Sequence, residues 1–485
     1  MDLVHNSAMS RAIGTGHRRA AVLMFAALLA ANACTSVSPS PSLPASAVPP
    51  PPTSTHGQTL APSSGSQTPS PTPQVVPGNP TPSPQAPPTS CTCTFAPPQT
   101  PTPSVDPAVA AQIDAITAQV PPIRELQPTK NVPYQEISRD AFSSFIASQS
   151  DQDTTPEWRA AEEQFLKRIG LLPPTADLQG LLDQLYSAEV AAYYQPTDGT
   201  FYLIETGQPF GPADKVAVAH EYTHALQDQH FDLEGNRIKD PAEGDAALAQ
   251  LSVIEGDATL SSQLWMVANM SEAEQSQLVT QALGELGQDQ LASMPTILRR
   301  QLEFPYGEGF LFTRDIYGLG GFDAVNQAIQ TPPASTEQIL HSDKYYNHEQ
   351  PVTVDAPSIM ALSESGGWSN DYQQTMGELN IQVLAAGGEK PAIDIPGLPV
   401  TWPHQEVAAG WGGDRLNMYD NASTGAWLID WHTAWDTQAD ADEFSARMTE
   451  LQSTFQGTLE LIPGPQTVRF VLASDPSLFL ALPSG

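Results

Sequence analysis

The sequence has few cysteines and few basic residues, and both shortages exclude classes of protein. Only 3 of the 485 residues are Cys, too few for a small fold held together by disulfides. Lys and Arg number 20 against 54 Asp and Glu, which gives a net charge of −34. Nucleic acids and anionic lipid surfaces both require basic side chains on their partners. We therefore expect no nucleic-acid partner, and no membrane contact beyond the N-terminal segment.

The N-terminus has the pattern of an export signal. Basic residues precede the apolar run 20–30, and the sequence Ala-Asn-Ala at 31–33 fits a signal-peptidase site. Cys34 follows directly, as the lipidated Cys does in bacterial lipoproteins, although Ala31 stands where lipoproteins prefer Leu. We expect a signal peptide over 1–33 and an extracytoplasmic protein, either lipid-anchored at the outer face of the bacterial cell membrane or secreted. No later apolar run is long enough to span a bilayer.

The next segment, residues 34–105, is rich in Pro, Ser and Thr, and it contains no Asp, Glu, Lys or Arg. Such a composition cannot bury enough apolar surface to offset the entropy of the chain. We expect a disordered, extended tether. Cys91 and Cys93 lie within it without His or acidic neighbours, which favours an incidental pair or a linker disulfide over a metal site.

The rest of the chain has the pattern of an α+β fold in two domains. Helical spacing of apolar residues runs through much of 106–350, with a hairpin predicted at 192–205 and an Ala-rich helix at 240–270. In 351–485 the pattern changes to short strands, paired glycines and Trp. Three Trp alternate along 427–435 and so share one face of a strand. We interpret them as the core of a C-terminal α+β domain, with a sugar- or peptide-binding platform as the alternative.

One motif points to chemistry, His220-Glu221-Tyr222-Thr223-His224. Residues four apart lie on the same face of a helix, so the two His can bind one Zn²⁺ through neutral imidazoles. Glu221, beside the first His, is placed to act as general base toward a water that the metal acidifies. Apolar neighbours predict that this helix, over 215–230, is buried. The motif indicates a zinc-dependent metallopeptidase that acts on a protein or peptide substrate.

The order of elements around the motif resembles the gluzincin branch of the zincin metallopeptidases. A predicted strand at 200–204 precedes the motif helix, and in zincins an edge strand in this place pairs with the substrate backbone. The chain is also similar to a family of uncharacterised bacterial exported proteins with a gluzincin-like core, through the segments 219–233, 253–259, 304–306, 332–345 and 410–415. The resemblance implies a mostly helical zincin-like catalytic domain with a small edge sheet, and zinc as its cofactor.

Three residues compete as the third zinc ligand. His230 follows His224 at the spacing of metzincins, but Gln227 stands where those enzymes have Gly. Glu243 has the spacing of aminopeptidase-type gluzincins, but it also fits the third position of a helix capping box. Glu255 lies among apolar residues of a predicted helix, where a carboxylate needs a partner, and its Glu-Gly-x-Ala context is that of the gluzincin ligand. We favour Glu255 and keep the other two as alternatives.

Peptide hydrolysis also needs a group that stabilises the developing oxyanion. Thermolysin-like enzymes use a His and aminopeptidase-like enzymes a Tyr, both downstream of the motif. His341 and Tyr345 are the candidates here, with Tyr306 as a weaker one. Asp228, one turn after His224, is the candidate hydrogen-bond acceptor for that imidazole.

Two other functions stay open at this point. One is a catalytically inactive domain that only binds metal. The other is a cell-envelope or polysaccharide-binding lipoprotein that works through its Trp-rich region.

Overall fold

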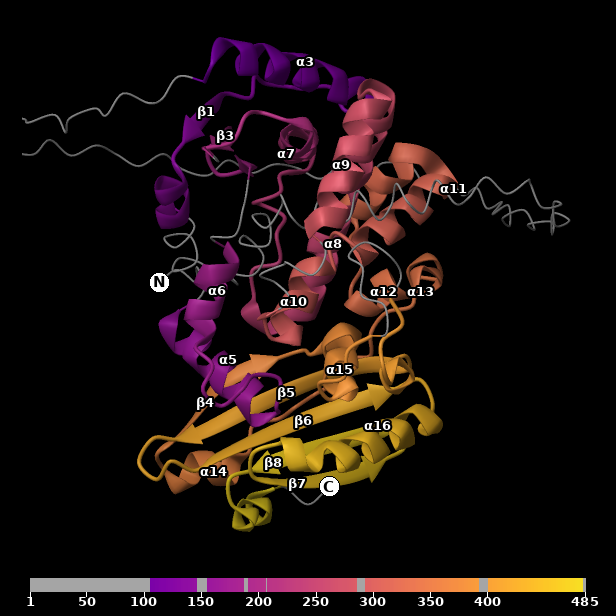
Figure 1. Ribbon diagram of the computed structural model, residues 1–485. Helices are drawn as coiled ribbons and strands as arrows, with labels where there is room; N and C mark the ends of the chain where they lie inside the picture. Colours follow the sequence, from indigo (N-terminus) through magenta and orange to yellow (C-terminus); the bar gives the residue numbers. More distant parts are fainter. Residues whose placement is uncertain are drawn as a thin grey trace, which may run out of the picture. The chain divides into compact units, whose positions relative to one another are not determined.

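The computed structural model describes residues 105–145, 155–186, 191–205, 207–285, 293–391 and 400–482. The predicted signal peptide, Cys34 and nearly all of the tether lie outside these ranges. The described residues combine many helices with a C-terminal sheet, which confirms a mixed α+β fold (Figure 1). Within them, no helix is both long enough and apolar enough to cross a membrane.

Helices dominate the described residues up to 346. In chain order the elements are α3 (Pro107–Arg124), β1 (Tyr134–Ile137), α5 (Pro156–Arg168), α6 (Leu178–Tyr186), β2 (Ala192–Gln195), β3 (Thr200–Ile204), α7 (Pro212–Phe231), α8 (Gly244–Asn269), α9 (Glu272–Glu285), α10 (Thr296–Glu303), α11 (Glu308–Gln330), α12 (Thr336–Leu340) and α13 (Ser342–Tyr346). Three of them, α3, α5 and α7, begin with Pro, whose missing N–H costs no hydrogen bond in the first turn.

The predicted start of the Ala-rich helix is wrong in detail. A 3-10 turn, Pro241–Glu243, precedes α8, and Asp240 caps that turn by accepting a hydrogen bond from the backbone N–H of Ala242. The Glu243 carboxylate does not complete a capping box, because it pairs with the guanidinium of Arg415 at 2.9 Å. A tertiary ion pair has therefore replaced the local contact that the pattern suggested.

The small sheet has the strand order β1-β3-β2. The predicted hairpin is confirmed, with β2 antiparallel to β3 and Tyr193 opposite Tyr202. β1 pairs with β3 in parallel on the other side. The strand at 200–204 is therefore central, so the expectation that it forms the free edge is wrong. The edge strand that packs against α7 is β2.

A second sheet, antiparallel throughout with the order β4-β5-β6-β8-β7, forms the C-terminal part. Its elements are α14 (Met360–Ser365), β4 (Trp368–Gln374), α15 (Gly377–Ala386), β5 (Trp411–Asn421), β6 (Trp427–Trp435), α16 (Gln438–Leu451), β7 (Thr458–Gly464) and β8 (Thr467–Ala473). α16 packs on β6 and β8. Trp431 and Trp435 are buried there against Phe444 of α16, so these two indoles act as core and present no open face to a sugar.

Apolar side chains from both sides of residue 350 belong to one hydrophobic core. Phe304, Ile381 and Trp431 are all members of it and are fully buried. A buried carboxylate, Asp414 of β5, joins the layers by accepting hydrogen bonds from the indoles of Trp411 and Trp431 and from two backbone N–H groups that begin α15. The sheet therefore supports the helices through shared packing.

Candidate metal centre

α7 holds the two His of the motif in a buried setting. The helix packs against α3, α8 and β2. His220 and His224 are 4% and 7% exposed, and their ring centroids are 4.7 Å apart. The helical spacing of four residues has therefore placed both imidazoles on one enclosed face, as the sequence predicts.

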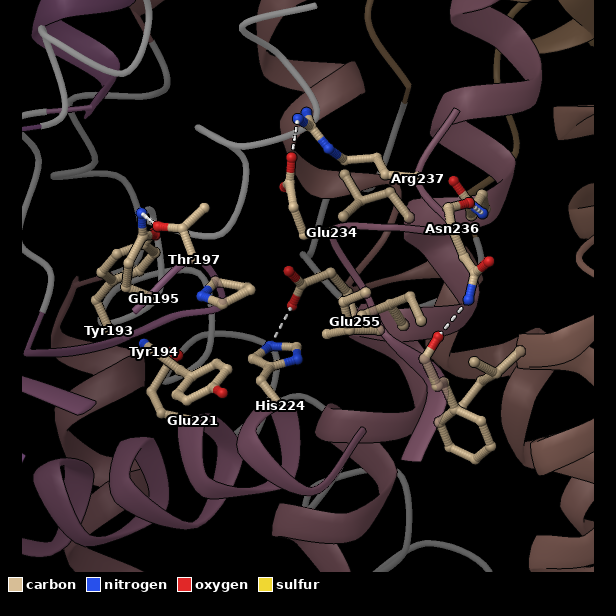
Figure 2. A pocket seen from close by; sticks show the side chains of 17 residues that line it. Tyr193, Tyr194, Gln195, Thr197, Glu221, His224, Glu234, Asn236, Arg237 and Glu255 are labelled. Atoms are coloured by element: carbon tan, nitrogen blue, oxygen red, sulfur yellow. Dashed lines mark hydrogen bonds and ion pairs between the residues drawn. The ribbon is translucent and has the colours of Figure 1, made fainter. Parts of the chain in front are cut away.

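α8 brings Glu255 to these two imidazoles, and Figure 2 shows its carboxylate pointing at His224. Glu255 Oε2 lies 3.1 Å from His220 Nε2 and 3.3 Å from His224 Nε2, and the two Nε2 atoms are 3.1 Å apart. Glu255 is 2% exposed. Among the described residues these three form a buried group with the composition and spacing of a metal site.

The donor set fits a zinc ion. In a tetrahedral site with zinc–ligand distances of about 2.0–2.1 Å, neighbouring ligand atoms lie about 3.3 Å apart. The separations of 3.1–3.3 Å among the three donor atoms match this value. Two imidazoles and one carboxylate are also the ligands of many catalytic zinc sites, which leave the fourth position to water or substrate.

Glu221 lies beside this group and is oriented by the edge strand. Its Oε2 accepts a hydrogen bond of 2.9 Å from the backbone N–H of Tyr194 in β2. The side chain is 1% exposed, yet Glu221 lines the same pocket as His224 and Glu255. β2 thus contributes to the site in two ways, by holding this carboxylate and by forming a wall of the pocket.

A buried chain of polar groups supports His224. Its Nδ1 is 2.8 Å from Gln227 Oε1, and the Gln227 amide donates to Asp257 Oδ2 at 2.7 Å. Asp257 in turn pairs with Arg124 of α3 at 2.7 Å, and both side chains are fully buried. Gln227 Oε1 is an acceptor, so this contact requires the proton on Nδ1, which is the arrangement in which an imidazole can bind a metal through Nε2.

Sequence reasoning named a different supporting residue for His224. Asp228 instead accepts the hydroxyl of Tyr194 at 2.8 Å and takes no part in the chain of groups behind the imidazole. Gln227 could have been found, because a residue three positions after His224 shares its helix face. Asp257 could also have been identified from the sequence, because a charged residue within an apolar helix requires a partner.

The charges at the centre shift two pKa values. Burial lowers the pKa of His224, but the nearby Glu255 carboxylate outweighs burial and raises the pKa to about 9 in the metal-free protein. Burial and the charges of Glu255 and Glu221 raise the pKa of Tyr306 well above its usual value, so this phenol stays protonated and hydrogen-bonds to Glu255. Tyr306 is 2% exposed, and its ring lies 6.2 Å from that of His220.

The two alternative third ligands lie elsewhere. His230, near the end of α7, is exposed, and its Nε2 contacts the backbone carbonyl of Gln127 at 2.8 Å. Glu243 pairs with Arg415 of β5. Of the three candidates, Glu255 is the one whose carboxylate the packing of α8 on α7 brings to His220 and His224.

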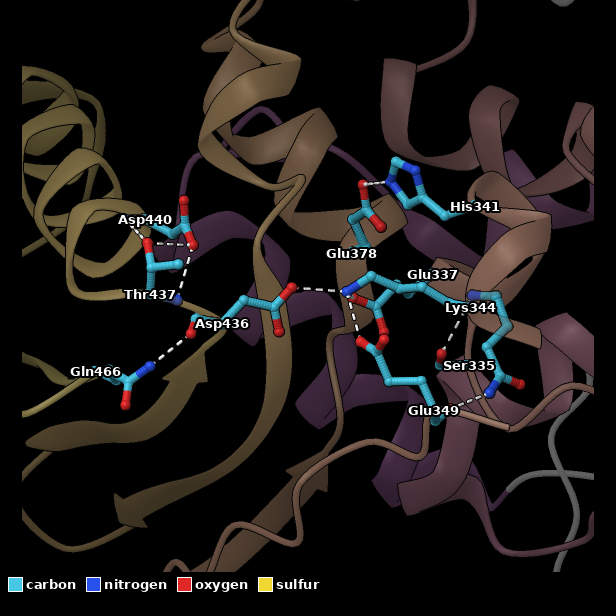
Figure 3. A network of polar contacts seen from close by, with 11 residues as sticks. Ser335, Glu337, His341, Lys344, Glu349, Glu378, Asp436, Thr437, Asp440 and Gln466 are labelled. Atoms are coloured by element: carbon cyan, nitrogen blue, oxygen red, sulfur yellow. Dashed lines mark hydrogen bonds and ion pairs between the residues drawn. The ribbon is translucent and has the colours of Figure 1, made fainter. Parts of the chain in front are cut away.

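His341 and Tyr345 do not join the pocket that Glu221 lines. His341 Nε2 pairs with Glu378 Oε1 of α15 at 2.9 Å, and this hydrogen bond raises the pKa of the imidazole (Figure 3). The Tyr345 hydroxyl donates to the carbonyl of Thr331 at 3.0 Å. Both side chains have structural partners. Tyr306, the weaker candidate from the sequence, lies at the metal centre instead.

A second acidic group in the described residues already contains a cation. Glu337, Glu349 and Asp436 converge around the ammonium group of Lys344, at 2.6, 2.8 and 2.7 Å (Figure 3). The ammonium group already lies between these three carboxylates. The contact joins α13 to the end of β6 and is best understood as structural.

Comparison with known proteins finds that the C-terminal sheet is similar to one family of domains. Residues 364–475 match a family described as a domain of unknown function, DUF8575. This match covers β4 to β8 and leaves the His-His-Glu group outside it. No curated protein and no solved structure matches the chain.

Proposed function

We propose that the chain is a zinc-dependent metallopeptidase, with His220, His224 and Glu255 as metal ligands and Glu221 as general base. The observation that carries the proposal is the buried triangle of two imidazole nitrogens and one carboxylate oxygen, with a second carboxylate beside it. That combination supports hydrolysis over metal storage, because a storage site does not need a proton acceptor oriented next to the ligands. The zincin-like fold named from the sequence belongs to the same proposal.

Each residue has a separate task in this proposal. Zinc, when bound, supplies Lewis acidity that polarises the scissile carbonyl and acidifies a water molecule. Glu221 takes the proton of that water at its carboxylate and passes it to the departing amine. The backbone N–H of Tyr194 keeps Glu221 in place. Tyr306 is the protonated group that we assign to oxyanion stabilisation, in place of His341 and Tyr345. Its hydroxyl, which bonds to Glu255 in the metal-free protein, would turn to the oxyanion when that carboxylate binds zinc.

Export and lipid anchoring through Cys34 also stay proposals. They rest on the sequence pattern of the N-terminal segment, which lies outside the described residues. A peptidase exported in this way would meet protein or peptide substrates outside the cytoplasm.

The test combines metal analysis with hydrolysis of a quenched fluorescent casein. Purified without a metal-affinity tag, the protein should contain about one zinc per chain, the stoichiometry of a single mononuclear site. His220→Ala should lose the metal, whereas His230→Ala, on the same helix but exposed and away from the ligands, should keep it. Glu221→Gln should keep zinc and lose hydrolysis by about 100- to 10,000-fold, the usual contribution of a general base.

The outcomes separate the functions. Zinc without hydrolysis in the wild-type protein would favour the metal-binding alternative. Hydrolysis that survives unchanged in Glu221→Gln would refute the assignment of the base. Absence of zinc after dialysis against it would refute the metal centre itself.

A further inference from the structure

We infer that the pocket beside the metal centre receives a bulky, uncharged apolar side chain of the substrate, next to the bond that is cut. The inference rests on the proposed peptidase function and adds a specificity to it. Its basis is the position of the pocket, the chemistry of its walls and the state of its polar groups.

The pocket and the metal centre are continuous (Figure 2). Glu221, His224 and Glu255 line the pocket together with residues of β2, of the turn after it, of the loop after α7 and of one face of α8. A substrate side chain held here therefore sits next to the groups that we assign to peptide hydrolysis. A pocket in this place determines which peptide bond of the substrate is cleaved.

The walls are mainly apolar. α8 contributes Leu251 and Ile254, which precede Glu255 by one turn and by one residue. Further apolar surface comes from Tyr193, Phe231, Leu233 and Ile329, among others. Such walls favour a side chain that gains from leaving water, such as Leu or Phe.

The polar side chains in the walls are occupied by bonds within the protein. Gln195 accepts the hydroxyl of Tyr193 and donates to Thr197 Oγ1 at 2.6 Å. Gln250 accepts the backbone N–H of Ile238 at 2.9 Å and donates to the carbonyl of Asn236 at 2.9 Å. These amides hold the turn and the loop in place, so recognition of a polar substrate side chain would break bonds that build the pocket.

The charged groups of the pocket also argue against a charged substrate side chain. Glu234 pairs with Arg237 at 3.3 Å and with Lys239 at 3.4 Å, so the acid at this end is balanced within the protein. An acidic side chain would meet Glu221 and Glu255, and the cations at the other end, Arg237 and Lys239, already pair with Glu234. A basic side chain would lose its hydration in the pocket, and Glu234, the acid at the far end, already pairs with two cations. An uncharged apolar group avoids both costs.

The first experiment measures kcat/KM of the zinc-loaded wild-type protein on quenched peptides that differ at one residue beside the scissile bond. On one side of that bond, Leu and Phe should exceed Ala by about 10- to 100-fold, the range expected for filling an apolar pocket, and should also exceed Asp and Lys. Equal rates for all five residues on both sides, or a preference for a charged one, would overturn the inference. Absence of hydrolysis would instead refute the proposed function, so the two failures are distinguishable.

The second experiment assigns the preference to this pocket. Leu251→Phe fills the pocket and should lower kcat/KM for the Leu and Phe peptides by at least about tenfold, while the Ala peptide changes little. Leu264→Phe is the matched control, because Leu264 is also partly buried on α8 but does not line the pocket. An equal loss on all peptides, or an effect of Leu264→Phe as large as that of Leu251→Phe, would overturn the assignment.

The loop provides an independent variant if the α8 variant does not fold. Leu233→Ala enlarges the pocket from the side of the loop and should shift the preference toward larger side chains. Unchanged zinc content in each variant shows that the effect is on specificity. An unchanged profile in Leu233→Ala with zinc retained would count against this pocket.

Discussion

Substituting Gly256 by Ala drives a methyl group into the contact between α8 and α11, one residue from Glu255. A Cβ at position 256 would lie 2.2 Å from the carbonyl oxygen of Gly309 and 2.5 Å from Thr313 Oγ1. The contact is reciprocal, because a Cβ at Gly309 would lie 2.4 Å from the carbonyl oxygen of Ser252. Two glycines thus let the two helix backbones approach each other where Glu255 is held.

The expected cost follows from these distances. The Gly309 oxygen belongs to the backbone and cannot rotate away, so α11 must move by about 1 Å to restore a normal contact. Overpacking of this kind costs up to about 3 kcal/mol, and Ala returns about 1 kcal/mol of helix propensity. We expect Gly256→Ala to lower the free energy of unfolding by about 2 kcal/mol.

Urea unfolding of the metal-free protein, followed by circular dichroism and Trp fluorescence, measures this change. The matched control is Gly318→Ala in α11, where a Cβ has nothing within 4 Å. That variant should gain about 0.5–1 kcal/mol from helix propensity alone. If Gly256→Ala proves as stable as Gly318→Ala, the close approach of α8 and α11 is wrong, and with it the placement of Glu255.

Three further predictions test other parts of the structure. Gln227→Leu removes the partner of the ligand imidazole and should weaken zinc binding by about 10- to 100-fold in competition with a chromophoric chelator, whereas unchanged affinity would refute the supporting role. Arg124→Met leaves the Asp257 carboxylate buried without its cation and should cost about 3–5 kcal/mol in urea unfolding; a loss below 1 kcal/mol would contradict that pairing. Burial, opposed by an ammonium partner, raises the pKa of Glu337 to about 7, so the folded chain binds more protons than the unfolded one and the contribution of Glu337 to stability falls as pH rises from about 4.5 to 7. Glu337→Gln should flatten that part of a stability profile measured by thermal unfolding between pH 4.5 and 8, and an unchanged slope would count against the shift.

The local part of the site could be predicted from the sequence. Spacing of four residues on one helix places His220 and His224 on a common face whatever surrounds them, and Glu221 follows from its place between them. The hairpin of β2 and β3 is equally local, since its turn residues and its alternating pattern lie within one short segment. The strand and helix pattern after residue 351 likewise predicted the C-terminal α+β part.

Contacts between distant segments were decided only by the tertiary structure. Glu255 is 35 residues from His220, and the sequence favoured it as the third ligand but left His230 and Glu243 as alternatives. The packing of α8 on α7 brings Glu255 to the two imidazoles. Tertiary structure also decided that β2 is an edge strand of the small sheet, that Tyr306 lies at the metal centre and that His341 pairs with Glu378. Spacing along the chain determines which residues share a helix face, but helix packing and strand order determine which faces meet. The chemistry of the motif was therefore readable in the sequence, whereas its third ligand and its pocket required the fold.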